Sequence, residues 1–272
     1  MQLPHLTRAA SLAALLLICA SPARAQRPVT HNTLISDTLP KVTLHLDSTF
    51  SMSTLEILKL ILTLISGVCW TIVYIDGIRL GFKHKSYAIP FYALALNLAW
   101  ELIHAVRGFY AGPDLQTIIN CVWYLFDVGI LWTYLKFGAK YFPPNIPQRW
   151  FGVWTLLGLG TAFLVEYAFI REFDPFVGGA YAAFLQNLLM SVLFITMLVR
   201  RGSREGQSFV IAINKWIGTL APTILFGVIG SGAFRGPSFL VLVLGVLCSI
   251  FDLIYIYLLT RAREFTLKAS EI

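Results

Sequence analysis

The fold is decided by residues 87–106, which read YAIPFYALALNLAWELIHAV. This run is long enough to cross a bilayer as a helix, because about 20 apolar residues span the hydrocarbon core. It nevertheless carries Glu101, and an acid at membrane depth is costly and tends to face a cavity that serves a purpose. Asn97 and His104 lie on the same helical face as Glu101. This polar stripe indicates either an interior site or a structural hydrogen bond between helices.

The composition is that of a polytopic membrane protein. Hydrophobic residues make up 57% of the 272 residues and charged residues only 13%, with a mean hydropathy of +0.72. The net charge of +7 comes from basic residues in short loops between apolar runs, where they set orientation. We therefore expect the lipid bilayer as a partner and no nucleic acid. The cysteines are placed singly, without the CxxC spacing of a metal site or redox pair.

The first residues predict export. Residues 1–25 have the layout of a secretory signal peptide, with early basic residues, a short apolar run and the sequence Ala23-Arg24-Ala25 before Gln26. An uncleaved first helix is the alternative. Residues 26–53 are polar and without period, which predicts a flexible exported arm.

Seven apolar runs predict an all-α bundle of seven transmembrane helices over residues 54–260, followed by a cytoplasmic tail at 261–272. Each run can cross a bilayer as a helix, the sixth only with flanking residues. The loops are too short for an extramembrane catalytic domain, so any chemistry is expected within the bundle. The runs are 55–75, 87–106, 117–137, 150–170, 179–199, 216–230 and 239–259.

Basic residues alternate between the connections and predict the orientation. One side carries Arg79, Lys83, Lys85, Lys136, Lys140, Arg149, Arg200, Arg201, Arg204, Lys215, Arg261, Arg263 and Lys268. The other carries only Arg107, Arg171 and Arg235. This excess predicts a multi-pass protein with an exterior amino terminus and a cytoplasmic carboxyl terminus. The membrane would be the cytoplasmic membrane in a bacterium and the endoplasmic reticulum in a eukaryote.

Two acids are the candidates for catalysis. Glu101 and Asp252 each stand among bulky apolar residues, with no lysine or arginine nearby in sequence. Burial disfavours the charged carboxylate, so we expect both to be neutral proton donors. Helical rise places Glu101 about 8 Å and Asp252 about 20 Å below the outer edge, which favours a cavity with an acid at each end. Further polar stripes are Asn120, Tyr124 and Asp127; Gln186, Asn187 and Ser191; and Ser249 and Tyr255.

Other side chains are expected to line or support this interior. Aromatic residues within the runs include Trp100, Tyr124 and Tyr255, and their π faces could stabilise a cation. Asp127 either lines the cavity wall or bonds a neighbouring helix. Glu166, near the outer end of its helix, is expected to be solvated.

The sequence lacks the residues that several metal-dependent and cofactor-dependent reactions need. The chain has no DDxxD or NDxxD cluster for magnesium and a diphosphate, and its single ExxH motif, at Glu101 and His104, is too little for a diiron bundle. The last run has no lysine for a retinal Schiff base. We therefore expect no metal and no cofactor.

Several segments together resemble the integral-membrane terpene cyclases of fungal meroterpenoid and indole-diterpene pathways. The segments are FKHKSY at 82–87, NLAWE at 97–101, QNLLMS at 186–191, GQSF at 206–209 and FDLIY at 251–255. The exported leader and arm depart from typical members. The resemblance implies a metal-independent cyclase of the isomerase or lyase type, in which Glu101 and Asp252 correspond to two essential acids.

The implied reaction is protonation of a terminal epoxide or olefin on a prenyl chain, followed by a cation cascade. The substrate would be a lipophilic prenylated compound, supplied by a pathway prenyltransferase and epoxidase. Expected substrate-binding residues are Asn97, Trp100, His104, Tyr124, Asp127, Gln186 and Tyr255. The alternatives are a small proton-coupled transporter, a ligand-binding seven-helix protein, or an accessory subunit of a prenyl pathway.

Overall fold

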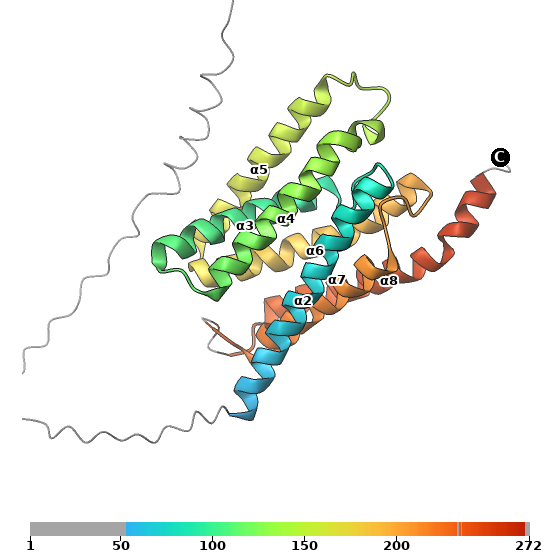
Figure 1. Ribbon diagram of the computed structural model, residues 1–272. Coiled ribbons are helices and arrows are strands. Elements are labelled where there is room, and N and C mark those ends of the chain that lie inside the picture. Colours follow the sequence, from blue (N-terminus) through green and yellow to red (C-terminus); the bar gives the residue numbers. More distant parts are fainter. Residues whose placement is uncertain (1–52, 233, 235, 270–272) are drawn as a thin grey trace, which may run out of the picture. The chain divides into compact units, whose positions relative to one another are not determined.

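The computed structural model describes residues 53–269, apart from residues 233 and 235. The predicted signal peptide, the arm up to residue 52, and Arg235 lie outside the described residues. Within this part of the chain seven α-helices follow one another, as the apolar runs predicted (Figure 1). They are α2 (Thr54–Lys83), α3 (Phe91–Ala111), α4 (Leu115–Phe137), α5 (Trp150–Glu172), α6 (Pro175–Arg201), α7 (Phe209–Pro222) and α8 (Phe239–Ala269).

Local capping explains where several helices begin. Ser53 and Glu56 form a capping box at the start of α2, and the Asp114 carboxylate accepts the backbone N–H of Thr117 at the start of α4. Asp174 caps α6 and Pro175 follows it at the first helical position, where a missing N–H costs nothing. α6 ends at Gly202, whose φ of 58° is the left-handed conformation that glycine adopts readily.

The sixth helix begins earlier than its apolar run predicted. Ser208 Oγ accepts the backbone N–H of Ile211 at 3.1 Å, and this cap starts α7 at Phe209. The prediction that Lys215 lies in a loop between two helices is therefore wrong. This lysine lies inside α7 and is 0% exposed. Beyond Pro222 the chain continues as the π-helix η2 (Thr223–Ile229).

Two other elements extend past the apolar runs. A short 3₁₀ helix, η1 (Gly138–Tyr141), continues the chain directly after α4. The last helix runs to Ala269, ten residues beyond the predicted end of its apolar run at residue 259. The first part of the predicted tail is therefore helical.

Helix packing forms a closed ring. Each helix packs against its neighbours in the order α2, α4, α3, α5, α6, α8 and α7, and α7 packs against α2 again. α3 also packs against α6 across the ring, so it contacts three helices besides carrying the polar stripe. Figure 1 shows α7 between α2 and α8, as these contacts require. The largest buried cluster includes Tyr74, Phe194 and Tyr255.

The outer faces of the helices are apolar. Leu64 of α2, Leu125 of α4 and Leu164 of α5 are among many large hydrophobic side chains that are more than half exposed. Such a surface belongs in lipid, because a water-soluble protein rarely exposes apolar faces of this extent. Six of the described helices are long and apolar enough to cross a membrane. α3 falls outside this set by its composition, since the polar stripe lowers its mean hydropathy.

Candidate functional site

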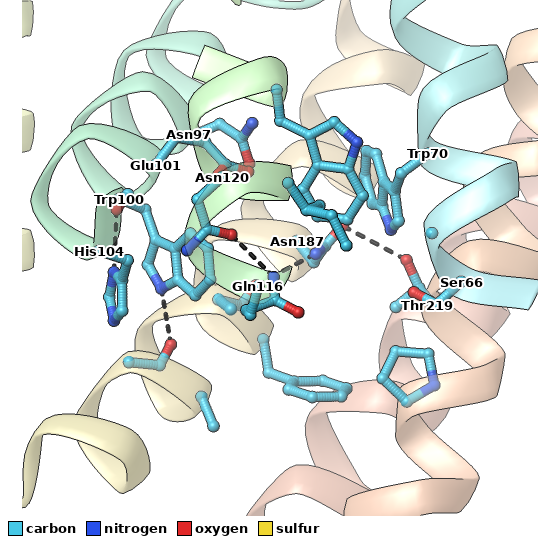
Figure 2. Close-up of a pocket in the computed structure, with 18 of the residues that line it drawn as sticks. Ser66, Trp70, Asn97, Trp100, Glu101, His104, Gln116, Asn120, Asn187 and Thr219 are labelled. Atoms are coloured by element: carbon cyan, nitrogen blue, oxygen red, sulfur yellow. Dashed lines mark hydrogen bonds between the residues drawn. The ribbon is translucent and has the colours of Figure 1, made fainter. Parts of the chain in front are cut away.

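The interior of the ring contains a cavity of about 330 Å³. Its walls come from α2, α3, α4, α6, α7 and η2. The polar face of α3 therefore shares this cavity with helices from the first and the last parts of the bundle. Figure 2 shows Asn97, Glu101 and Asn120 along one wall, with Ser66 and Thr219 across from them. A volume of this size is at the lower end of the range for small-molecule sites.

Glu101 lines this cavity while being only 2% exposed. Its Oε2 atom is buried and has no hydrogen-bond partner. Among the described residues no lysine, arginine or histidine forms an ion pair with this carboxyl group. An acid placed in this way has both a free oxygen and an adjacent space for a guest molecule.

Asn97 connects the Glu101 wall to its supporting residues. Its Nδ2 donates to the hydroxyl of Tyr74 at 2.6 Å and to Oδ2 of Asp127 at 2.8 Å, and its Oδ1 accepts from Gln186 Nε2 at 3.2 Å. One side chain thereby links α2, α3, α4 and α6. Because Asn97 lies one helical turn before Glu101, this network fixes the part of α3 that carries the acid.

Trp100 and His104 form a second fixed unit on α3. Their rings stack with centroids 4.0 Å apart, Trp100 Nε1 donates to the carbonyl of Gly179 at 2.8 Å, and His104 Nδ1 lies 2.9 Å from the Trp100 carbonyl (Figure 2). His104 Nε2 is buried and has no hydrogen-bond partner. Both residues line the cavity.

Aromatic rings from several helices complete the apolar walls. Trp70 packs against Tyr74, and Tyr74 packs against Trp123, with ring centroids 6.1 Å apart in each case. The Nε1 of Trp123 donates to Thr71 Oγ1 at 3.2 Å, which fixes this indole. The aromatic lining is Trp70, Tyr74, Trp100, Trp123, Phe176, Phe184 and Phe226. The cavity is therefore suited to an apolar guest that carries positive charge at some stage.

Further polar side chains line the cavity, some across from Glu101 and some on α4. Asn187 Oδ1 accepts from Thr219 Oγ1 at 3.4 Å, and Ser66 Oγ donates to the backbone carbonyl of Gly218 at 2.8 Å. On α4, Gln116 Nε2 donates to Asn120 Oδ1 at 2.8 Å. These residues line the same cavity and provide groups that could bind a polar part of a guest.

The expectation that Asp252 is a lone acid is wrong. Lys215 Nζ lies 2.8 Å from Oδ1 and 2.9 Å from Oδ2 of Asp252, and the two side chains are 0% and 1% exposed. Lys215 Nζ also donates to Ser191 Oγ at 2.7 Å. Asp252 is not among the residues that line the Glu101 cavity, so the two acids do not stand at opposite ends of one chamber.

Three of the expected binding residues lie behind the wall or away from it. Asp127 is 0% exposed and does not line the cavity, but it accepts a hydrogen bond from Asn97, which does, and this favours the structural interpretation of the acid. The Tyr255 hydroxyl donates to Gln207 Oε1 at 2.8 Å, outside the cavity. Tyr124 does not line the cavity either.

Glu166 was expected to be solvated, but it is 1% exposed and lines neither described cavity.

Sequence reasoning missed Trp70, Tyr74 and Trp123 as cavity residues. Trp70 and Tyr74 are spaced four residues apart on α2, which was a usable signal for one helical face. Lys215 was missed because a lysine beside an apolar run is typical of a loop.

Known proteins resemble this chain over its helical region. A model of the Pyr4-like transmembrane terpene cyclases matches residues 47–265. The chain is 32% identical over 171 residues to the Pyr4-family terpene cyclase mfmH of Annulohypoxylon moriforme, covering 61% of this chain and 68% of the relative. It is 31% identical to the terpene cyclase macJ of Penicillium terrestre, covering 60% and 64%. It is 23% identical to the asnovolin H synthase nvfL of Aspergillus novofumigatus, covering 71% and 79%.

The matched stretch thus spans roughly two thirds of the length of the first two relatives. No solved structure matches the chain.

Proposed function

Because the chain belongs to the Pyr4-like transmembrane terpene cyclases, we propose that Glu101 protonates the terminal epoxide or olefin of a prenylated compound and starts its cyclisation. The family match confirms the resemblance predicted from the sequence. The observation that carries the proposal is the buried Glu101 oxygen without a partner, beside a cavity with aromatic walls.

The surroundings of Glu101 favour a neutral carboxyl group. No described cation neutralises it, and a charge placed among aromatic rings would lack solvation. A neutral carboxyl group is a hydrogen-bond donor and a general acid. Asn97 fixes the preceding turn of α3, so the acid is held in place before a substrate enters.

The proposed reaction conserves atoms. The Glu101 O–H bond breaks and a new O–H bond forms on an epoxide oxygen, or a new C–H bond forms on an olefin carbon. The C–O bond of the protonated epoxide then breaks, or the π bond of the olefin is used to form the C–H bond, and the carbon left electron-deficient accepts the π electrons of the next double bond, which closes a ring. The last cation loses a proton, which returns to the Glu101 carboxylate directly or through solvent, so the acid is restored and the product is an isomer of the substrate.

The aromatic walls suit the intermediates of this cascade. Trp70, Trp100 and Trp123 line the cavity, and hydrogen bonds from Trp100 and Trp123 fix their indole rings. A ring face near a cation contributes about 0.5–2 kcal/mol, and more where water is excluded. Fixed rings would also exclude water, which would otherwise capture the cation.

Asp252 acts in this proposal through Lys215 and not as a second proton donor. Ser191, which accepts from Lys215, donates to the backbone carbonyl of Asn187 at 2.9 Å, and Asn187 lines the cavity. The ion pair therefore fixes the α6 and α7 wall. Loss of either charged residue would disturb the site even though neither touches the substrate.

The test uses the full chain in proteoliposomes with a synthetic farnesylated phenol that carries a terminal epoxide. Chromatography and NMR would detect a cyclic isomer. Glu101→Gln is expected to lower its formation by about a hundredfold or more, because it removes the general acid while keeping the shape. The matched control is Glu172→Gln, the same chemical change at the exposed end of α5.

Normal turnover by a folded Glu101→Gln variant would remove the proposal. Uptake of the unchanged compound into the vesicles, with no new ring, would favour the transporter alternative.

A further inference from the structure

A second cavity, of about 490 Å³, lies away from the Glu101 cavity and shares none of its lining residues. It is formed where the start of α3, the end of α4, η1, the start of α5 and the end of α6 meet. Nothing in the proposed reaction uses it. This end of the bundle carries the basic connections that predict the cytoplasmic side.

The charges on this cavity have one sign. Lys140, Arg200 and Arg201 line it, and no aspartate or glutamate does. Glu205 lies nearby and pairs with Lys140 at 2.5 Å, so one of the three cations is already neutralised. Two positive charges remain for an external anion.

One nitrogen of the Arg201 guanidinium has no hydrogen-bond acceptor among the described residues. The guanidinium lies between the rings of Tyr87 and Tyr141, 4.4 and 4.3 Å from their centroids. Its Nη1 donates to the backbone carbonyls of Tyr87 at 3.0 Å and Glu205 at 2.7 Å. Its Nη2 is buried and has no hydrogen-bond partner. Because a buried donor without a partner is costly, this atom indicates a missing acceptor.

The remaining lining is apolar and aromatic. It includes Phe91, Phe151, Trp154, Leu193 and Met197. A ligand that fits both halves of the cavity has an anionic head and a hydrocarbon body. A phosphate group suits an arginine in such a position, since its oxygens accept several N–H groups at once.

From this arrangement we propose that the second cavity binds the phosphate head group of an anionic phospholipid. Basic pockets between transmembrane helices on the cytoplasmic side are a recurrent way of holding such head groups. The phosphate would accept from Arg201 Nη2 and interact with Arg200, while the acyl chains would extend along the apolar lining. The proposal is independent of the reaction assigned to the Glu101 cavity.

The test measures lipid binding by the full chain purified in a mild detergent. Phosphatidylglycerol, phosphatidylcholine and inorganic phosphate are titrated separately, and the thermal unfolding midpoint is followed. Phosphatidylglycerol alone is expected to raise the midpoint. The double variant Arg200→Met with Arg201→Met removes the two cations that remain unpaired, and it is expected to bind the lipid about thirtyfold more weakly, because each basic residue contributes about fivefold.

The matched control is Lys83→Met with Lys136→Met, which removes two exposed charges from the same end of the bundle without altering the cavity. Arg200→Ala alone repeats the test at one exposed side chain, in case the double variant is unstable. Equal loss in the control pair, or equal response to phosphatidylcholine, would overturn the proposal. A midpoint raised by inorganic phosphate, which then prevents the lipid effect, would assign the site to free phosphate instead.

Discussion

Two buried acids of the same kind have different surroundings in this protein. Glu101 lines a cavity and has an oxygen without a partner, whereas Asp252 is fully engaged by Lys215. The distinction depends on one lysine inside a helix. At the scale of single residues, the chemistry assigned to each acid therefore follows from its neighbours and not from its residue type.

Removing one partner of the Lys215–Asp252 ion pair should destabilise the protein more than removing both partners. Asp252→Asn or Lys215→Met alone leaves a buried charge without its partner, and we expect each to destabilise the fold by about 3–5 kcal/mol. Lys215→Met combined with Asp252→Leu removes both charges, and we expect it to recover most of the stability. Thermal unfolding in detergent measures the stability, and cyclic product measures the activity.

The double variant separates a positioning role from a catalytic one. If Asp252 positions the α6 and α7 wall, the double variant should form product at a rate within about tenfold of the wild type. A double variant that is folded and inactive would show that the Asp252 carboxyl group takes part in the reaction.

α3 is the element that links fold and site. It packs against α4, α5 and α6, and it supplies Asn97, Trp100, Glu101 and His104 to one cavity. It contacts α6 at Gly179, where an added Cβ would meet the His104 ring. That ring is fixed by its stacking on Trp100, so it has little room to move.

Gly179→Ala should therefore disturb the site through packing alone. We expect a loss of about 1–3 kcal/mol in stability, because overpacking forces side chains or backbone to shift. We also expect an altered product profile, since Trp100 donates to the Gly179 carbonyl. The control is Gly160→Ala on α5, where an added Cβ meets nothing within 4 Å. A variant at Gly179 with unchanged stability and products would contradict this account of the contact.

At the scale of the whole molecule, the apolar outer faces of the helices place the protein across the membrane. The orientation stays a prediction. It rests on the larger number of basic residues at one end, and this number falls from thirteen to twelve once Lys215 is assigned to the interior of α7. Twelve against three still predicts that this end is cytoplasmic. The predicted cleavage after Ala25 also remains untested.

The orientation can be measured with single cysteines in a background that lacks the natural ones. In intact cells, or in sealed microsomes with the lumenal side enclosed, a membrane-impermeant maleimide should distinguish Lys83→Cys from Glu172→Cys. These residues end α2 and α5 and are exposed. We expect Glu172→Cys to react in intact bacterial cells and Lys83→Cys in sealed microsomes. The reverse labelling would show that the orientation is inverted.

The sequence by itself determined the membrane class, the order of the seven helices and the position of an acid, Glu101, inside one of them, because hydrophobic length and an acid within it are local properties of the chain. It also contained enough of the motifs of the transmembrane terpene cyclases to predict the family. Only the tertiary structure decided that Lys215 pairs with Asp252, that Asp127 supports Asn97, and that Trp70 and Trp123 form cavity walls. These contacts join residues from different helices, and the side-by-side placement of α7 and α8 or of α2 and α4 depends on packing that no single stretch encodes.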